Sequence, residues 1–130
     1  YVQGALTWTT GADDEGEPVR HVAPLFANAH IVYENQNLKA DFFFRYNGEI
    51  SADDLAPSET DKFHMYALNT DGEAYSPAWH TLNFRIMYKL NQRIELSGAV
   101  ENITDQQYRP YSSGIVAPGR NFIISARYSF

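Results

Sequence analysis

The feature that most constrains the fold of this chain is a repeat of apolar side chains at every second position. It is clearest in residues 82–90, where one face carries Leu82, Phe84, Ile86, Tyr88 and Leu90. Successive side chains of a β-strand point to opposite faces, so this period predicts strands rather than helices. The same alternation occurs in Leu38–Asn47, Ile94–Glu101 and Phe122–Phe130, and less regularly in Val2–Thr10 and Ala27–Glu34. The sequence therefore predicts six strands and an all-β fold.

The connections between these segments alternate strictly between short and long. Glu34–Asn37 and Leu90–Arg93 are short and rich in asparagine, which favours tight hairpin turns. Gly11–Ala23, Ser51–Trp79 and Thr104–Arg120 are long and polar. An antiparallel ribbon of this kind places its short turns at one end and its long loops at the other. Outer-membrane β-barrels are built in this way.

Two all-β architectures share this alternation. A soluble β-sandwich also has strands with one apolar and one polar face. Three features favour a membrane barrel. The predicted strands are roughly 9–11 residues long, as a tilted bilayer span requires, whereas strands of soluble sheets average about 5–6. The long loops lie on one side only, and aromatic residues near the ends of the apolar faces suggest an interfacial girdle: Tyr46, Trp79, Tyr88, Tyr108, Tyr128 and Phe130.

Composition excludes several classes of protein. A formal net charge of −6 argues against nucleic acid as a partner. No run of about 18 apolar residues is present, so a transmembrane helix is excluded. The absence of cysteine excludes a disulfide framework, a zinc finger and a thiol nucleophile. The opening residues, Tyr1–Gly4, read as a strand and not as a signal peptide.

No catalytic or metal-binding motif is found, so we expect a non-enzyme without a cofactor. No serine lies in a G-x-S-x-G elbow, and the four histidines lack H-E-x-x-H spacing. His64 lies in the longest loop, where an exposed polar residue is a better interpretation than a haem or metal-chelate contact. Acidic residues crowd two loops without a calcium-loop spacing, which favours solvated charge: Asp13, Asp14, Glu15, Glu17, Asp53, Asp54, Glu59 and Asp61.

Several motifs resemble those of the TonB-dependent receptors of the bacterial outer membrane. Gly98–Tyr108 resembles their G-x-x-E-N-[IL]-[TF]-D-x-x-Y signature, and Pro118–Phe122 resembles the P-G-R-x-[FY] motif that begins the closing strand. Ser76–Arg85 resembles the segment that opens the third-last strand. Val22–Phe26 is similar to an [IV]-P-P-L step, with Ala23 in place of the first proline. The composition is closest to the Bacteroidetes-like branch of the family.

Local chemistry accounts for some of these motif positions independently of the family. Gly119 has no Cβ at the point where the chain must turn from loop into strand. Pro118 has no N–H to give to a β-ladder, so it belongs outside the paired region. Asn102 and Asp105 bracket the start of a turn, where short polar side chains bond to nearby backbone amides. We therefore expect a structural role for these four residues.

The resemblance implies an antiparallel transmembrane β-barrel of about 22 strands around a lumen that an N-terminal plug domain fills. Residues 1–130 are then the C-terminal part of this barrel, its last six strands, with the plug and earlier strands absent. The short turns are expected to be periplasmic and the long loops extracellular. An open sheet edge is not tolerated in lipid, so these strands must pair with the upstream strands of the barrel.

The same resemblance implies the function and the partners. It predicts TonB-energised uptake of a scarce nutrient across the outer membrane, with an iron siderophore, haem, cobalamin, a similar chelate or an oligosaccharide as substrate. Expected partners are the plug, the upstream strands, the TonB complex, the barrel-assembly machinery and outer-membrane lipid. A passive porin-type barrel, which has no plug, and a soluble β-sandwich binding module are the alternatives.

Candidate site residues fall into three groups. Substrate contact is expected from aromatic and arginine side chains of the long loops: Tyr66, Tyr75, Tyr108, Arg109, Tyr111 and Arg120. Charged residues on the polar faces of the strands are expected to face the lumen and the plug: Lys39, Asp41, Arg45, Arg85, Lys89, Glu95, Glu101 and Arg127. By resemblance alone, the aromatic Phe130 is the signal that the barrel-assembly machinery reads.

Overall fold

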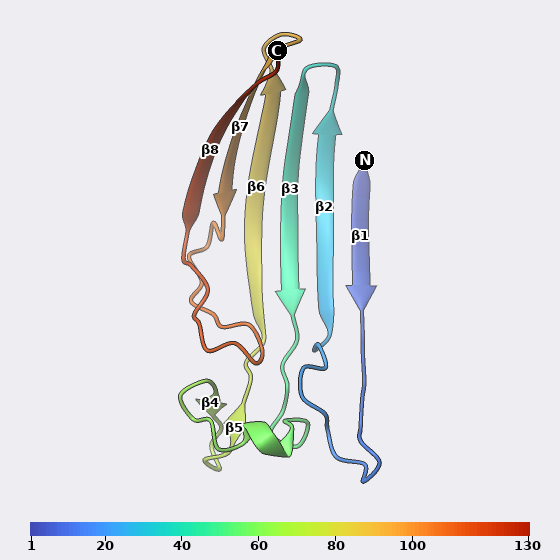
Figure 1. Ribbon diagram of the computed structural model, residues 1–130, viewed down its shortest axis with the longest axis vertical. Helices are drawn as coiled ribbons and strands as arrows, with labels where there is room; N and C mark the ends of the chain where they lie inside the picture. Colours follow the sequence, from blue (N-terminus) through green and yellow to red (C-terminus); the bar gives the residue numbers. More distant parts are fainter.

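The computed structural model describes residues 1–130 and contains one six-stranded antiparallel sheet (Figure 1). Its strand order is β1-β2-β3-β6-β7-β8, so each strand pairs with its neighbours along the chain. The strands are Val2–Thr7 (β1), Phe26–Glu34 (β2), Leu38–Asn47 (β3), Trp79–Lys89 (β6), Ile94–Glu101 (β7) and Asn121–Tyr128 (β8). No helix has the length and apolar character needed to cross a membrane. The prediction of an antiparallel all-β fold with six strands is confirmed.

The register of the ladders separates the side chains of the sheet into two faces. Phe42 pairs with Phe84, and Ile86 pairs with Gly98, so their side chains share one face, which we call the apolar face. No Asp, Glu, Lys or Arg side chain lies on that face. The opposite face, which we call the polar face, holds every charged side chain of the six strands: Glu34, Lys39, Asp41, Arg45, Arg85, Lys89, Glu95, Glu101 and Arg127.

Both short hairpins are closed by an asparagine side chain. Asn35 Oδ1 accepts hydrogen bonds from the backbone N–H groups of Asn37 at 3.0 Å and Leu38 at 2.8 Å. Asn91 Oδ1 accepts the same pair of bonds from Arg93 at 2.8 Å and Ile94 at 2.9 Å. An asparagine in this position replaces a backbone turn by its own side chain. The predicted tight turns are confirmed.

Three predicted strands are shorter in the structure than the bilayer-span length. β1 ends at Thr7 instead of Thr10, because its partner β2 begins at Phe26, opposite Thr7. β7 and β8 have 8 residues each, and β8 ends at Tyr128, opposite the first residue of β7. The central strands β2, β3 and β6 have 9, 10 and 11 residues. The two edge strands, β1 and β8, and β7 beside β8 are therefore the short ones, and the longest strands lie in the middle of the sheet.

The sheet is a single layer, and nothing in the chain covers its apolar face. The exposed fraction is 69% for Phe122, 91% for Ile124 and 72% for Leu6. The accessible surface of the chain is 8943 Å², whereas a compact monomer of this mass has about 7,000 Å². A β-sandwich buries its inner face against a second sheet, and no second layer is present here. The sandwich alternative is therefore wrong for this chain.

All three long connections lie at one end of the sheet, opposite the two short turns (Figure 1). This loop end contains a cluster of buried hydrophobic side chains that pack together, formed by Leu55, Tyr66 and Ala74. The connection between β3 and β6 also contains a 3-10 turn, Pro57–Glu59, and a small hairpin of β4 (Ala67–Leu68) and β5 (Ala74–Tyr75). The sequence predicted a polar loop here, and the structure shows a folded unit.

Candidate functional site

The loop after β7 begins with a turn that Asn102 organises. This residue is buried and has a φ of 51°, a left-handed conformation that asparagine tolerates better than most residues. Its backbone N–H donates to Asn83 Oδ1 at 2.9 Å. Its side chain accepts from the Gln106 N–H at 2.9 Å and donates to the Gln106 carbonyl at 2.8 Å. The asparagine therefore fixes the direction in which the loop leaves the sheet.

The two ends of the same loop are joined by Asp105. Asp105 Oδ1 accepts the backbone N–H of Arg120 at 2.7 Å. A Cβ on Gly119 would lie 2.6 Å from that oxygen, so only glycine fits there while the bond is made. The Arg120 side chain returns through Nε to the Ile103 carbonyl at 2.9 Å. We call Asn102, Asp105, Gly119 and Arg120 the loop clasp, and its contacts confirm the structural role expected for Asn102, Asp105 and Gly119.

The loop clasp presents Tyr108 and Arg109 to the beginning of β6, where a pocket of about 330 Å³ is found. The Tyr108 ring stacks on Trp79, with 4.1 Å between ring centroids and 28° between planes. Tyr66 enters the wall from the β3–β6 connection. Burial raises the pKa of the Tyr108 hydroxyl, so the phenol is neutral at physiological pH. The pocket thus combines aromatic surface with polar groups from two loops and one strand.

Two N–H groups in the wall of this pocket have no hydrogen-bond acceptor. Arg109 donates to the His64 carbonyl through one terminal nitrogen, but its Nε is buried and unpartnered. The Trp79 Nε1 is also buried and unpartnered. Unmade hydrogen bonds of buried donors are rare and costly in folded proteins. Both groups can only donate, so this wall favours a ligand that supplies acceptors.

A second cluster, behind the pocket, ties the loops together around Glu59. This carboxylate has no exposed surface, receives hydrogen bonds of 2.7 Å from Lys62 Nζ and the Tyr66 hydroxyl, and pairs with Arg20 of the β1–β2 loop. Burial opposes its ionisation, yet the bonds from Lys62 and Tyr66 and the charge of Arg20 lower the pKa of Glu59. Tyr66 in turn lies 6.3 Å from Tyr111 of the β7–β8 loop. Glu59 therefore ties the β1–β2 loop to the β3–β6 connection, and Tyr66 extends the cluster to the β7–β8 loop.

Burial against Glu59 also fixes the protonation state of the Tyr66 hydroxyl. Desolvation first, and then the bond to the Glu59 carboxylate, raise the pKa of Tyr66 well above its ordinary value. The hydroxyl therefore donates to Glu59 throughout the physiological pH range. The prediction that Glu59 belongs to a group of solvated loop charges is wrong. The feature of the sequence that could have indicated a buried Glu59 is the neighbouring Pro57, which begins the 3-10 turn that carries the carboxylate inward.

The predicted substrate contacts separate in the structure. Tyr66, Tyr108 and Arg109 line the pocket, whereas Tyr111 lies behind Tyr66 and Tyr75 faces a shallow hollow on the other side of the hairpin. Arg120 is engaged in the loop clasp. The sequence did not select Gln106 or Gln107, which also line the pocket.

The predicted aromatic girdle is correct only in part. Trp79 pairs with Asn47 and so lies on the polar face, and Tyr108 lies in a loop and stacks on it. Neither therefore belongs to an apolar rim. Tyr46 and Tyr88 do lie on the apolar face, near opposite ends of the sheet. Phe130 lies beyond β8 and contacts Tyr128 edge to face, at 5.2 Å.

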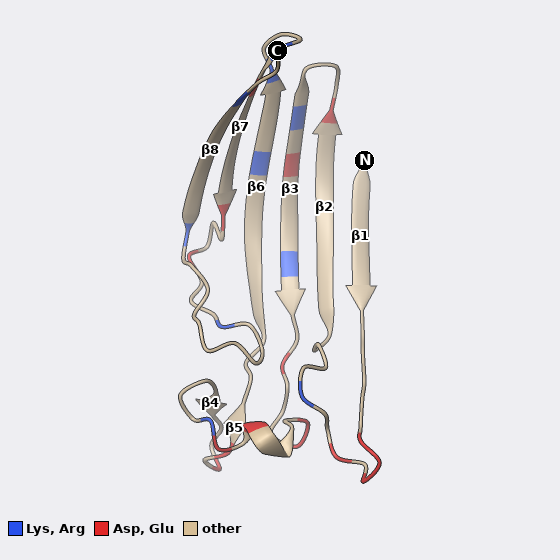
Figure 2. Cartoon of the chain, viewed as in Figure 1, with Lys and Arg blue, Asp and Glu red and all other residues tan.

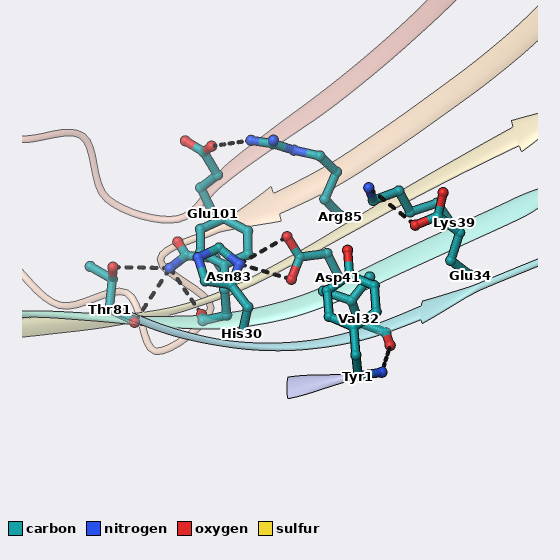
Figure 3. A network of polar contacts seen from close by, with 11 residues as sticks. Tyr1, His30, Val32, Glu34, Lys39, Asp41, Thr81, Asn83, Arg85 and Glu101 are labelled. Carbon is teal, nitrogen blue, oxygen red and sulfur yellow. Dashed lines mark hydrogen bonds and ion pairs between the residues drawn. The ribbon is translucent and has the colours of Figure 1, made fainter. Parts of the chain in front are cut away.

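The polar face carries a network that spans β2, β3, β6 and β7 (Figure 3). His30 Nδ1 lies 3.0 Å from Asp41 Oδ1, and its ring stacks on Phe43 at 5.1 Å. The guanidinium groups of Arg45 and Arg85 lie 5.2 and 5.6 Å from the same Phe43 ring, within the range of cation–π contact. Polar and cationic groups thus surround the Phe43 ring on the polar face.

Further polar contacts extend this network along the strands. Arg85 forms an ion pair with Glu101 at 3.6 Å, and Lys39 pairs with Glu34 at 3.4 Å (Figure 3). Asn83 Nδ2 donates to the Phe43 carbonyl at 3.2 Å and is buried. All eight residues predicted to face a lumen share this face. No group of three or more histidine and acidic side chains is placed to hold a metal ion.

Comparison with known proteins adds to this geometry. No protein-family model matches the sequence. Among solved structures, the chain is similar to the copper transporter OprC, with a TM-score of 0.75, 17% identity and 99% of the chain covered. It is also similar to the siderophore receptor PirA from Acinetobacter baumannii, with a TM-score of 0.70, 20% identity and 99% coverage. The chain spans 20% of the length of each. This likeness shows that the chain has the fold of a six-stranded, antiparallel β-barrel segment, as found in part of each of these two proteins.

Proposed function

We propose that residues 1–130 form the last six strands of the barrel of a TonB-dependent outer-membrane receptor that imports a scarce nutrient. The observation that carries this proposal is the uncovered apolar face. It holds no Lys, Arg, Asp or Glu, although the same strands carry many such residues on the polar face. Monomeric soluble proteins rarely expose a contiguous apolar surface of this extent. Lipid is the partner that such a face fits.

The other surfaces of the sheet support the same arrangement. The polar face suits a water-filled lumen and a plug domain, which the His30–Asp41 and Arg85–Glu101 pairs would meet. β1 and β8 each have one unpaired edge, and lipid does not tolerate unpaired edges. Upstream strands of the same receptor would close both edges. The long loops are then extracellular and the two short turns periplasmic.

Within such a receptor this chain supplies barrel wall and a binding rim. The pocket at Trp79, Tyr108 and Arg109 lies at the loop end, where an external ligand arrives first. The structurally similar proteins are named as a copper transporter and a siderophore receptor. An iron siderophore, haem, cobalamin or a similar chelate is the class of substrate we propose. Energy comes from the TonB complex through the plug. The barrel-assembly machinery reads Phe130, and the chain performs no covalent chemistry.

The lipid assignment can be tested with cysteine probes, because the chain has no cysteine of its own. Ile124→Cys lies on the apolar face and Ser125→Cys lies on the polar face of the same strand. Each variant of the complete receptor is labelled with an environment-sensitive fluorophore and reconstituted in vesicles. We expect lipid-soluble quenchers to act at position 124 and water-soluble quenchers at position 125. Equal access of water-soluble quenchers to both positions contradicts a lipid-facing sheet.

The alternative of a passive porin-type barrel requires a separate measurement. A porin predicts nutrient uptake that does not depend on TonB and a complete gene without a plug domain. Uptake by cells that carry the receptor is therefore compared in strains with and without functional TonB. Loss of uptake without TonB supports the proposed function, and equal uptake in both strains supports the porin.

A further inference from the structure

The loop end of the molecule is strongly acidic, and only one of its basic side chains, Arg109, takes part in neither the Glu59 cluster nor the loop clasp. Twelve of the 16 Asp and Glu residues lie in the three connections at this end, residues 8–25, 48–78 and 102–120, which contain only four of the ten Lys and Arg residues (Figure 2). Of these four, Arg20 and Lys62 both pair with Glu59, and Arg120 is engaged in the loop clasp. Arg109 is the remaining one. It has no carboxylate partner and lines the pocket beside Trp79.

An unpaired, half-buried guanidinium within an acidic region needs an anionic partner. The wall around it offers no such group, since no acidic residue lines the pocket. Arg109 Nε and Trp79 Nε1 both lack acceptors, so the wall presents unused donors as well as positive charge. Both atoms are shielded from solvent, so a ligand can reach them only if the Tyr108–Arg109 segment moves. A carboxylate suits the planar, forked donor set of arginine.

The rest of the pocket wall is mostly apolar and favours a ligand group that is flat. The stacked rings of Trp79 and Tyr108 form a flat apolar surface, and Val116 and Met65 add aliphatic contacts. The volume of about 330 Å³ is at the lower end of ligand pockets, which span about 300–1,000 Å³. It accommodates one planar group of a larger molecule, not a whole macrocyclic chelate.

We propose that this pocket binds a carboxylate attached to a flat, unsaturated group. Arg109 holds the carboxylate, and the planar group lies against the Trp79–Tyr108 stack. This inference rests on the proposed function, because it describes the part of the imported substrate that the rim recognises. It narrows that substrate to molecules that bear an aromatic or conjugated carboxylate.

The test measures equilibrium binding of a small probe to the detergent-solubilised complete receptor. Fluorine NMR of 4-fluorobenzoate reports weak binding directly, and 4-fluorobenzamide is its uncharged analogue. We expect saturable binding of the benzoate, with the benzamide weaker by at least about tenfold because the charge-assisted bonds are lost. Equal binding of the two probes overturns the proposal. Competition by inorganic phosphate as strong as that by benzoate shows a simple anion site and also overturns it.

Variants connect the binding to the pocket. Arg109→Gln is expected to weaken benzoate binding by at least about tenfold, and Arg109→Lys by less, because lysine keeps the charge without the planar fork. Trp79→Phe keeps a ring and removes the N–H, so a smaller loss is expected. Arg93→Gln, in a short turn at the other end of the sheet, is the control and leaves binding unchanged. If Arg109→Gln and Arg109→Lys both bind benzoate like the unmodified receptor, the proposal is wrong.

The outcome is separable from that of the proposed function. Binding of benzoate in detergent needs neither TonB nor a membrane. If the receptor imports its nutrient but does not bind benzoate, the proposed carboxylate site is wrong and the proposed function is unaffected. A protein that binds benzoate at Arg109 but shows no TonB-dependent uptake supports the pocket and contradicts the proposed function.

Discussion

The sheet and the loop end of this molecule are stabilised in different ways. The sheet has regular hydrogen bonding and an apolar face that stays open, so its side chains find their apolar surroundings outside the chain. The loop end has little regular structure, yet it contains the buried Leu55–Tyr66–Ala74 core and the fully buried Glu59. The stability of the sheet therefore depends on the medium around its apolar face, whereas the stability of the loop end depends on specific contacts within the chain. Each half is sensitive to a different kind of change.

The largest expected effect comes from a charge on the apolar face of the sheet. Ile86→Arg places a guanidinium among apolar side chains near the middle of β6, and Met87→Arg places the same group one residue later, on the polar face. An arginine at the bilayer midplane costs about 2–4 kcal/mol in a transmembrane barrel. We expect this loss of unfolding free energy for Ile86→Arg, measured by denaturant titration in vesicles.

Met87→Arg is the matched control for that measurement, because it adds the same side chain to the same strand. It is expected to change the unfolding free energy by less than about 1 kcal/mol, since the polar face already accommodates charge. Equal losses for the two variants would mean that the apolar face does not contact lipid, and the contrast between sheet and loop end would disappear.

The corresponding change at the loop end is Glu59→Gln. It removes the charge that Arg20 and Lys62 share, so the β1–β2 loop loses its anchor while the sheet keeps its structure. Breaking a buried ion pair on one side leaves the partner uncompensated. Trypsin cleavage after Arg20 and Lys62 in the folded receptor is expected to accelerate by about tenfold or more, because local opening becomes easier.

Two controls restrict the interpretation of this proteolysis. Glu17→Gln neutralises an exposed acid in the same β1–β2 loop and is expected to leave the cleavage rate unchanged. Cleavage after Arg93, in a short turn at the far end, serves as the internal standard within each sample. Faster cleavage at Arg93 in the Glu59→Gln variant would indicate general unfolding and would contradict a local role for Glu59.

A smaller effect is expected at the loop clasp. Gly119→Ala places a Cβ where Asp105 Oδ1 now lies, so the bond from Asp105 to the Arg120 N–H must lengthen or break. The loss of one charge-assisted hydrogen bond corresponds to about 1.5–3 kcal/mol at most. Asp105→Ala removes the same bond from the other side. In the double variant the two losses should not add, as a double-mutant cycle of thermal unfolding would show. Additive losses would mean that the two residues act independently.

The difference between the two regions also decides how much could be predicted from sequence. Period-two alternation indicates which face each side chain of a strand occupies, and it correctly predicts that Phe84 and Arg85 lie on opposite faces. Asn35 and Asn91 identified both short turns through local chemistry that needs no distant partner. Gly119 and Asp105 were recognised as structural for the same reason, although their contact with each other was not foreseen.

The loop end could not be predicted in this way, because its contacts join residues far apart in the chain. Arg20 and Glu59 lie in two different loops, and no local pattern in the sequence indicates that they form an ion pair. The alternation predicts that β6 begins at Leu82 and leaves Trp79 in the preceding loop, among the aromatics of a rim. In the structure β6 begins three residues earlier, and Trp79 lies on its polar face. Of the six predicted substrate contacts, Tyr66, Tyr108 and Arg109 share a pocket for reasons that only the tertiary structure provides.

The smallest expected effect is a response to acid that the loop end should show and the sheet should not. The pKa of Glu59 is lowered from an ordinary value of 4.5, so its ionised form is favoured in the folded loops. Its contribution is therefore complete above pH 4.5 and is lost as the pH falls through the lower folded-state pKa. Between pH 7 and pH 5 loop protection should stay constant, and it should decline at a pH below 4.5.

Hydrogen exchange of the loop amides across this range measures the response, since trypsin is inactive in acid. The amides of β3 and β6 serve as the comparison within the same molecule, and they should stay protected at every pH. In Glu59→Gln the acid response of the loops should be absent, because that side chain has no proton to gain. An acid response of equal size in Glu59→Gln would assign the effect to other carboxylates of the acidic loops, and Glu59 would then not be the group that joins them.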